Sequence, residues 1–348
     1  MDLRKHLLAG QVIPAHPLAL DEHRFLSEKH QRALTRYYFD SGAGGVAVGV
    51  HSTQFEIRDP RHGLFEPVLE LASRAIDEAQ LRAPRDFVKI AGVCGRTPQA
   101  MREAGLARGF GYDAALLSFS ALNGEAEDVL LEHAAAISGV LPVIGFYLQT
   151  AVGGRVLSHR FWRRFAEIPG IVAIKMAPFN RYRTIDVVRA VVESGRTDLA
   201  LYTGNDDTIV TDLLTPFEFE REGRKTGRRI EGGLLGHWGV WTRAAVELFG
   251  KIQRARSEAA VAADWLRTAA AVTDMNAALF DAANDFKGCI PGILEVLRRQ
   301  GLVPSAHCLD PHETLSAGQA DELTRVTKAY PVLTDDDFIA EHLDRWLR

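Results

Sequence analysis

A lysine within an apolar segment is the residue of this chain with the clearest chemical potential. Lys175 lies in Gly170-Ile-Val-Ala-Ile-Lys-Met-Ala-Pro178, a short β-branched run that is typical of a buried parallel strand. Burial of an ammonium ion is unfavourable, so it lowers the pKa of a lysine and favours the neutral amine. A neutral amine attacks carbonyl groups, and the segment therefore predicts a nucleophile. The alternative is a strand-end lysine whose ammonium group reaches solvent or pairs with a carboxylate.

A tyrosine at the end of the preceding apolar run is the second candidate. Tyr147 lies in Ile144-Gly-Phe-Tyr-Leu-Gln149. Adjacent parallel strands are about 4.8 Å apart, so Tyr147 and Lys175 approach each other if both side chains point inward. A phenol beside an amine can relay the protons that carbinolamine formation and breakdown require. The alternative is a buried aromatic ring whose hydroxyl bonds to the backbone.

The turn after the second apolar run carries a candidate site for a carboxylate. His51, Ser52 and Thr53, in Gly49-Val-His-Ser-Thr-Gln54, offer hydroxyls and successive backbone N–H groups that suit an anion. His51 is also a candidate acid or base near neutral pH. The alternative is a loop whose polar groups bond only to one another.

Two more strand-end clusters are candidate substrate-binding positions. Gly204 and Asn205 follow the seventh apolar run, where Asn205 can instead cap the next helix. Gly236 and His237 end the eighth run, where His237 can instead be an ordinary, partly buried histidine. No trio of His, Asp or Glu has the spacing of a metal site, so no metal is expected.

The order of the elements places these residues. Eight apolar runs alternate with amphipathic helical segments, which indicates a parallel sheet, and eight strands close a barrel filled by side chains. We therefore predict a (β/α)8 barrel, in which catalytic residues lie at the C-terminal ends of the strands. The predicted strands are 10–15, 44–50, 87–93, 113–119, 141–148, 170–177, 199–204 and 231–237, and the predicted helices between them are 21–41, 65–81, 97–108, 124–138, 158–167, 182–194, 207–217 and 242–256.

The last quarter of the chain changes pattern. From about Glu258 onward only helical segments are expected, over 258–283, 291–301, 318–329 and 335–347. We predict a barrel domain over residues 1–257 and a helical extension over 258–348. The stretch Phe217–Arg229, which ends in Gly-Arg-Lys-Thr-Gly-Arg-Arg, is interpreted as an irregular surface insertion.

Composition narrows the classes of function. The chain has 348 residues, 47% of them hydrophobic and 25% charged, with a formal net charge of −4, which gives no reason to expect nucleic acid or an anionic membrane as partner. No apolar stretch approaches the ~20 residues of a membrane span. Residues 1–8 lack the long apolar core and the small-residue cleavage site of a signal peptide, so none is expected. The three cysteines share no metal-like spacing and are interpreted as reduced thiols of a cytoplasmic protein.

The arrangement resembles that of the dihydrodipicolinate synthase / N-acetylneuraminate lyase family. The resemblance spans about residues 10–300 and rests on the order and spacing of Gly44-Gly-Val-Ala-Val-Gly, Gly111-Tyr-Asp-Ala-Ala-Leu-Leu, Leu141-Pro-Val-Ile-Gly-Phe-Tyr, Gly170-Ile-Val-Ala-Ile-Lys, Thr203-Gly-Asn-Asp-Asp and Gly232-Gly-Leu-Leu-Gly. It implies that Lys175 forms an imine with pyruvate or another 2-oxo acid, without a cofactor. Tyr147 would correspond to the tyrosine that transfers protons in that family. A homo-oligomer, a dimer or a tetramer built as a pair of dimers, is also implied.

Several positions depart from the pattern of that family. Its usual Gly-Thr-Thr-Gly-Glu turn is replaced by Gly49-Val-His-Ser-Thr. Val152 stands where dihydrodipicolinate synthases carry an arginine for the carboxylate of the second substrate, with Arg155 three residues farther on, and Ser120-Ala-Leu-Asn123 replaces their Pro-Tyr-Tyr-Asn segment. Because valine cannot form the arginine–carboxylate fork, lysine-pathway dihydrodipicolinate synthesis is not expected.

The leading hypothesis from the sequence is a Schiff-base lyase, an aldolase or dehydratase that acts on a 2-oxo acid, with sugar-derived 2-oxo acids among the candidate substrates. A second hypothesis is a protein that binds a keto acid or sugar acid on the same barrel without turnover. A third is a barrel enzyme in which Lys175 holds pyridoxal phosphate. The basic stretch Arg224–Arg229 could meet its phosphate, but it precedes the eighth strand, at the wrong end of the barrel.

Overall fold

The computed structural model describes all 348 residues, and its backbone divides into two compact units. The first comprises residues 1–11 and 88–234, and the second comprises residues 12–87 and 235–348. None of the helices has the length and apolar character that crossing a bilayer requires.

A row of parallel strands forms the centre of the first unit. Its order is β10-β7-β6-β5-β4-β3. All six strands are buried along their whole length, which explains why they are near-continuous apolar runs in the sequence. Their bounds are β3 (Val88–Val93), β4 (Ala114–Leu117), β5 (Val143–Leu148), β6 (Ile171–Ala177), β7 (Ala200–Thr203) and β10 (Gly232–Leu235), the last residue of which belongs to the second unit.

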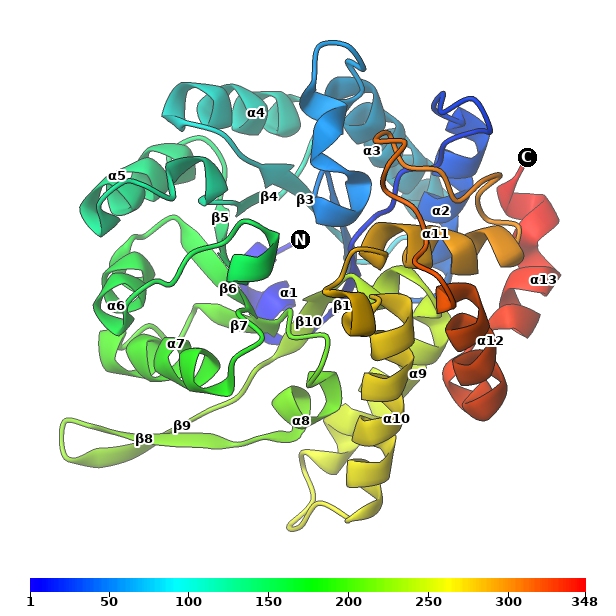
Figure 1. The fold of residues 1–348 in the computed structure, drawn as a ribbon. Coiled ribbons are helices and arrows are strands. Elements are labelled where there is room, and N and C mark those ends of the chain that lie inside the picture. The colour runs from blue at the N-terminus through cyan, green and yellow to red at the C-terminus, as the bar shows by residue number, and fades with distance from the viewer. The chain divides into compact units, whose positions relative to one another are not determined.

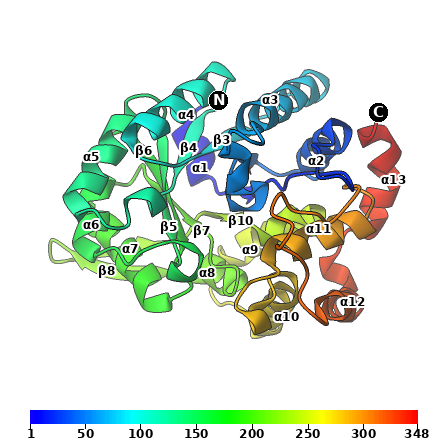
Figure 2. The ribbon, with the colours of Figure 1, turned by 45° about the horizontal axis from the view of Figure 1, so that its top comes forward.

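Helices alternate with these strands along the chain. Figures 1 and 2 show α4 to α7 on the outer side of the strands of this unit. A side chain on α6 shows how close this packing is, because a Cβ added at Gly145 of β5 would lie 2.5 Å from the ring of Phe165. The helices of the first unit are α1 (Leu3–Leu8), α4 (Thr97–Gly109), α5 (Glu127–Ser138), α6 (His159–Glu167), α7 (Arg181–Ser194) and α8 (Ile209–Leu214), with the short 3₁₀ turns η3 (Ser120–Leu122) and η4 (Thr150–Val152).

The second unit contains two parallel strands and most of the helices. Strand β1 (Val12–Pro14) and strand β2 (Gly45–Val48) are parallel neighbours, and Ala15, which follows β1, forms a parallel bridge with Ala47. After residue 258 the chain contains helices and no strand. The helices of this unit are α2 (Glu28–Asp40), α3 (Phe65–Arg82), α9 (Thr242–Ala255), α10 (Asp264–Leu279), α11 (Cys289–Arg299), α12 (Gln319–Ala329) and α13 (Asp336–Trp346), with the 3₁₀ turns η1 (His51–Thr53), η2 (Phe55–Arg58), η5 (His237–Gly239), η6 (Ala282–Asn284) and η7 (Pro331–Leu333).

A buried carboxylate holds the start of the last helix. Asp335 accepts hydrogen bonds from the hydroxyl of Tyr37 (2.7 Å) and the backbone N–H of Arg243 (2.9 Å). Burial raises the pKa of this carboxyl group to about 6. The link therefore joins α13 to α2 and α9 of the same unit through one titratable group.

The structure corrects the interpretation of residues 217–229 as irregular. The segment forms an antiparallel hairpin of β8 (Phe217–Arg221) and β9 (Arg224–Arg228) in the first unit. Glu222 and Gly223 have φ values of 53° and 73°, as a two-residue hairpin turn with both central residues in the left-handed region requires. The alternation Phe217-Glu-Phe-Glu supports the strand, because one face of β8 packs on α7.

Two predicted helices are shorter than expected. The segment predicted over 21–41 is helical only from Glu28, because the chain before it turns back, with the backbone of Leu20 paired with Leu26. The segment predicted over 207–217 is helical only over Ile209–Leu214, since residue 217 already belongs to β8. The proposed domain boundary at residue 257 stays a prediction.

Candidate active site

Lys175 lies on β6 with its ammonium group over an aromatic ring. Phe146 of β5 and Tyr202 of β7 are its partners in the strand register, so these three side chains point to the same face of the sheet. The Nζ atom of Lys175 lies 4.3 Å from the ring centroid of Phe146, a distance at which the face of the ring attracts a cation. The hydroxyl of Tyr202 donates to the backbone oxygen of Leu7 (2.9 Å). The surface facing the amine is therefore mainly apolar.

Gly204 provides the space that the lysine side chain occupies. A Cβ added at Gly204 would lie 2.5 Å from Cε and 3.1 Å from Cγ of Lys175, and 2.9 Å from Cβ of Ala177. Ordinary carbon–carbon contacts are about 3.5–4.0 Å. Any side chain at Gly204 would therefore displace Lys175, which explains the need for glycine here. The predicted role of Gly204 in substrate binding stays a prediction.

Burial changes the acidity of Lys175. Its exposed fraction is 8%, and desolvation lowers the pKa of the ammonium group from 10.5 to about 8, although the negative charge of Asp206 opposes this fall. With a pKa of about 8, about a tenth of the lysine is neutral at pH 7. An ordinary lysine, with its pKa near 10.4, is neutral at that pH in less than about a thousandth of molecules.

Tyr147 lies on the opposite face of the sheet from Lys175. It pairs with Met176 in the register, one residue beyond Lys175, and successive side chains of a strand point to opposite faces. Its ring lies 5.0 Å from that of Trp162 on α6. Its hydroxyl donates to the backbone oxygen of Leu157 (3.4 Å) and accepts from the N–H of Leu157 (3.3 Å). The predicted approach of Tyr147 to Lys175 is therefore not found.

Asn205 is fixed by its own side chain. Its Oδ1 accepts from the N–H of Phe179 (3.0 Å), and its Nδ2 donates to Thr184 Oγ1 and to Asp212 Oδ2 (3.0 Å each). The alternative role as a helix cap is not found, since α8 has Thr208 as its N-cap residue and no side-chain cap. These bonds join the loops that follow β6 and β7, and so they position Gly204 and Asp206 on either side of Asn205.

The predicted carboxylate turn lies in the second unit and is partly occupied by its own hydrogen bonds. Thr53 Oγ1 accepts from the N–H groups of Gly49 (3.0 Å) and Val50 (3.2 Å) and donates to the backbone oxygen of His16 (2.6 Å). Ser52 Oγ donates to the same oxygen (3.4 Å). Two of the N–H groups that the sequence offered to an anion are thus bonded to Thr53. Anion binding by His51, Ser52 and Thr53 stays a prediction.

Gly236 and His237 lie in the second unit as well. A Cβ added at Gly236 would lie 2.7 Å from the ring of Phe280, so glycine accommodates this ring. His237 is buried, with Nδ1 3.4 Å from Asn276 Nδ2. Desolvation lowers the pKa of His237 to about 4, so the imidazole is neutral at pH 7. Substrate binding by either residue stays a prediction.

Two residues near Lys175 were not singled out from the sequence. Phe146 faces the amine, although the adjacent Tyr147 was the candidate. Asp206, which is 5% exposed, provides the negative charge that acts on Lys175. The sequence run Asn205-Asp-Asp-Thr208 contains two adjacent aspartates. Only the structure shows which of them, Asp206, acts on Lys175.

A small hollow opens beside Phe146 in the first unit. Arg155 lies on its edge, where Nη1 donates to the backbone oxygens of Leu122 (3.3 Å) and Glu125 (2.6 Å). The bonds hold the loop after β5 against the loop after β4. The remaining lining is largely apolar and is formed by Phe119, Ser120, Asn123, Leu148, Gly154 and Leu157.

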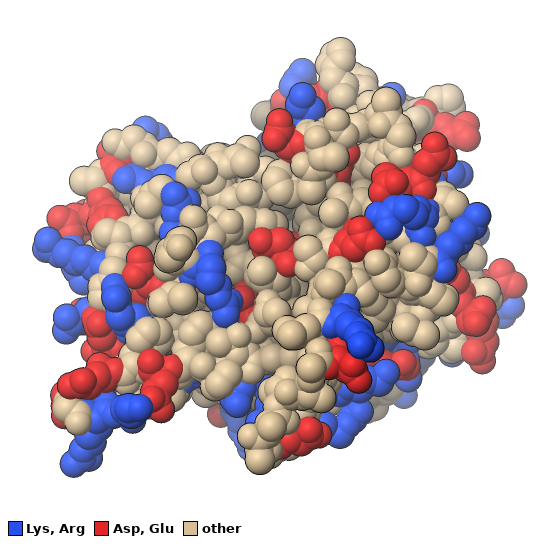
Figure 3. Space-filling view, turned by 60° about the horizontal axis from the view of Figure 1, so that its bottom comes forward, with Lys and Arg blue, Asp and Glu red and all other residues tan.

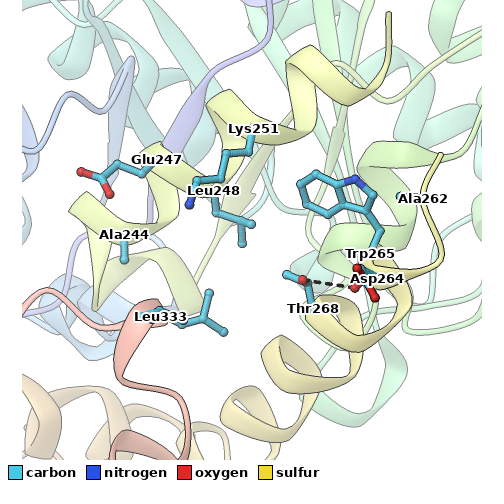
Figure 4. A pocket seen from close by; sticks show the side chains of 10 residues that line it. Ala244, Glu247, Leu248, Lys251, Ala262, Asp264, Trp265, Thr268 and Leu333 are labelled. Atoms are coloured by element: carbon cyan, nitrogen blue, oxygen red, sulfur yellow. Dashed lines mark hydrogen bonds between the residues drawn. The ribbon is translucent and has the colours of Figure 1, made fainter. Parts of the chain in front are cut away.

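A hollow in the second unit lacks a buried lysine. Figure 3 shows positive and negative side chains interspersed over the face in view. Figure 4 shows a hollow of the second unit between α9 and α10, with Lys251 and Glu247 on one side and the ring of Trp265 on the other. The lysine of this hollow, Lys251, is exposed to water. It therefore lacks the burial that makes Lys175 a candidate nucleophile.

Comparison with known proteins identifies the fold. The chain is 30% identical over 200 residues to the 4-hydroxy-tetrahydrodipicolinate synthase of Nitrosomonas eutropha, with 56% of this chain and 61% of that protein covered. It is 33% identical over 153 residues to the enzyme of the same name from Dechloromonas aromatica, with 42% and 49% covered. The matches thus span about half to three fifths of these relatives. No family model matches the chain.

Solved structures extend the likeness to almost the whole chain. The dihydrodipicolinate synthase of Acinetobacter baumannii complexed with pyruvate has a TM-score of 0.73 and 19% identity and covers 93% of this chain and 99% of that one. CdNal from Clostridium difficile in complex with mannosamine has a TM-score of 0.70 and 15% identity and covers 92% and 99%. The chain has the fold of the dihydrodipicolinate synthase / N-acetylneuraminate lyase family. The predicted (β/α)8 barrel with C-terminal helices, and the resemblance seen in the sequence, are confirmed.

Proposed function

We propose that this member of the fold family is a Schiff-base-forming lyase, an aldolase or dehydratase that acts on pyruvate or another 2-oxo acid. The observation that carries the proposal is Lys175, which is buried, faces Phe146 and has a pKa near 8. Its neutral form attacks the ketone carbon, and loss of water leaves a protonated imine. The imine withdraws electrons from the neighbouring carbon, which allows a C–C or C–O bond there to break or form.

Phe146 suits both charged states of the lysine. The ring attracts the ammonium ion before the reaction and the iminium ion after it, because both carry a positive charge. Gly204 leaves the lysine side chain in its extended path over the loop. Within the second unit, Thr53 orders the turn after β2 through its bonds to Gly49 and Val50, and His51 and Ser52 are proposed as anion-binding residues of that turn. Asn205 orders the loop after β7 in the first unit, and Gly236 and His237 are proposed as substrate-binding residues of the second unit.

The lysine-pathway reaction is excluded from the proposal. Val152 cannot bind a second carboxylate as an arginine does. Arg155 is the next basic residue along the sequence, and its Nη1 atom already donates hydrogen bonds to the backbone oxygens of Leu122 and Glu125. The relay tyrosines are absent from Ser120–Asn123. A homo-oligomer, either dimer or tetramer, is part of the proposal on the resemblance alone.

Trapping with borohydride tests the proposal. The protein is incubated with pyruvate and a panel of other 2-oxo acids in the presence of sodium borohydride, and its intact mass and the modified peptide are measured. The expected product is one reduced adduct on Lys175, and the Lys175→Met variant gives none. Absence of an adduct across the panel, or an adduct that persists in Lys175→Met, contradicts the proposal.

A binding protein without turnover is the second candidate. The observation that favours it is that Phe146, which has no exchangeable proton, faces the amine in place of a hydroxyl side chain. Under this alternative a 2-oxo acid raises the unfolding temperature of the protein by mass action, but no adduct is trapped and no product is released.

A further inference from the structure

The surroundings of Lys175 lack an obvious carrier for the protons of imine formation. The side chains that share its face of the sheet in the register are Phe146, which has no exchangeable proton, and Tyr202, whose hydroxyl donates to the backbone oxygen of Leu7. Tyr147 lies on the opposite face with its hydroxyl bonded to the backbone of Leu157. Imine formation nevertheless needs a group that removes a proton from nitrogen and delivers one to the departing oxygen.

Asp206 is the buried acidic residue nearest in the chain to Gly204, where Lys175 meets the loop after β7. It lies two residues beyond Gly204, over which the Cε atom of Lys175 passes. It is 5% exposed, and its negative charge raises the pKa of the lysine against the larger effect of desolvation. The neighbouring Asp207 differs, because the charges that act on it are those of Asp212 and Arg181.

The loop that carries Asp206 is held in place from both sides. Asn205 makes three side-chain hydrogen bonds, to Phe179, Thr184 and Asp212, and its own N–H donates to Thr203 Oγ1 (3.2 Å). Such ties restrict the backbone on which Asp206 stands, two residues from the glycine that contacts Lys175. A carboxylate fixed near a buried amine is suited to proton exchange with it.

We propose that Asp206 is a catalytic residue that carries the protons of imine formation at Lys175, in the place that a hydroxyl side chain would otherwise take. This inference rests on the proposed function. Asp206 first takes one proton from the ammonium group. The amine nitrogen then forms a bond to the ketone carbon, and the electron pair of the C=O double bond moves to oxygen.

The remaining proton transfers balance the reaction. The new oxyanion takes a proton from the nitrogen, which gives a neutral carbinolamine. Asp206 then returns its proton to the carbinolamine hydroxyl, the C–O bond breaks, and water leaves while the nitrogen lone pair forms the C=N bond. The ammonium ion and the ketone have become an iminium ion and one water molecule, and Asp206 is again a carboxylate.

Trapping rates of two matched variants test the role of Asp206. Asp206→Asn and Asp207→Asn are compared with the wild type in the rate of borohydride-trapped adduct formation with pyruvate at pH 7. General acid–base catalysis contributes about 10²–10⁴-fold, so we expect Asp206→Asn to lose about a hundredfold or more, and Asp207→Asn to keep the wild-type rate within about twofold. An undiminished rate in Asp206→Asn overturns the inference.

A second measurement separates proton transfer from a structural role. Arylation of Lys175 by trinitrobenzenesulfonate needs a neutral amine but no acid to expel water. We expect Asp206→Asn to react with this reagent at least as fast as the wild type, because removal of the carboxylate lowers the pKa of the ammonium group further. Equal losses in arylation and in pyruvate trapping overturn the inference, since they indicate a displaced lysine.

Chemical rescue of Asp206→Ala tests the role of the carboxyl group when a substitution impairs folding. Formate, but not chloride at the same ionic strength, is expected to restore part of the trapping rate in Asp206→Ala, because formate replaces the missing carboxyl group. No rescue in a variant that retains arylation of Lys175 counts against the inference. Failure of the wild type itself to form any adduct overturns the proposed function, whereas loss or retention confined to the Asp206 variants bears on Asp206 alone.

Discussion

Replacing Lys175 with methionine is expected to stabilise the protein while it removes the nucleophile. Methionine has a similar length and no charge, so it fills the path over Gly204 without an ammonium group to desolvate. The fall of the lysine pKa from 10.5 to about 8 corresponds to about 3 kcal/mol, because one pH unit is worth about 1.4 kcal/mol. The attraction of Asp206 is already contained in this value.

The pH dependence of this effect has a definite sign. Below pH 8 the lysine is charged in both the folded and the unfolded chain, and the whole cost of burying the charge is present. Between pH 8 and 10.5 the unfolded chain binds more protons than the folded one, so the stability of the wild type rises with pH. The gain of Lys175→Met is therefore expected to fall from about 3 kcal/mol at pH 7 to about 1 kcal/mol at pH 10.

Urea unfolding at the two pH values measures this gain. Lys251→Met is the matched control, because Lys251 is exposed, and its free energy of unfolding is expected to stay within about 0.5 kcal/mol of the wild type. A Lys175→Met variant that is no more stable than the wild type at pH 7, or a gain that does not shrink at pH 10, refutes the reasoning that Lys175 is a desolvated cation.

Three further predictions follow from the same geometry. Gly204→Ala places a methyl group 2.5 Å from Lys175 Cε, and we expect it to lower the free energy of unfolding by about 1–3 kcal/mol and to slow adduct trapping. The control Gly105→Ala, which has open space in helix α4, is expected to do neither, and equal behaviour of the two variants in urea unfolding and trapping contradicts this prediction. Phe146→Tyr adds a hydroxyl facing the amine and is expected to speed trapping about tenfold or more, and an unchanged rate shows that no further proton carrier is needed. Because the folded-state pKa of Asp335 is raised from 3.8 to about 6, the wild type loses stability as pH rises through this range. The change in the free energy of unfolding caused by Asp335→Asn is therefore expected to be more favourable at pH 7 than at pH 4 by about 2 kcal/mol, and equal changes at the two pH values in urea unfolding rule out this titration.

The buried strands were predictable because burial on both faces leaves a plain pattern. Runs such as residues 170–177 are apolar at almost every position, and the observed β6 covers Ile171–Ala177. The hairpin was missed because its residues are mostly charged, although the alternation over 217–220 and the Glu222–Gly223 pair are hairpin signals. For this segment, the alternation of apolar and charged residues predicts the strand better than the content of charged residues does.

Which side chains of β5 and β6 point to the same face of the sheet could not be predicted from the sequence. The register between β5 and β6 shifts between Val143 and Ile144, and a shift of one residue exchanges the two faces of a strand. Tyr147 was the candidate because it is the hydroxyl-bearing residue at the end of the strand, whereas the register places Phe146 beside Lys175. The nature of β5 and β6 could be predicted from composition, but the pairing between them depends on tertiary packing, including that of Gly145 against Phe165.

The proposed chemistry depends most directly on whether Lys175 forms an imine. Intact-mass and peptide analysis after incubation with pyruvate and borohydride at pH 7 measures this in one step. We predict a single reduced adduct located on Lys175 and none in Lys175→Met. An unmodified protein across a panel of 2-oxo acids, or an adduct located on another lysine, contradicts the account.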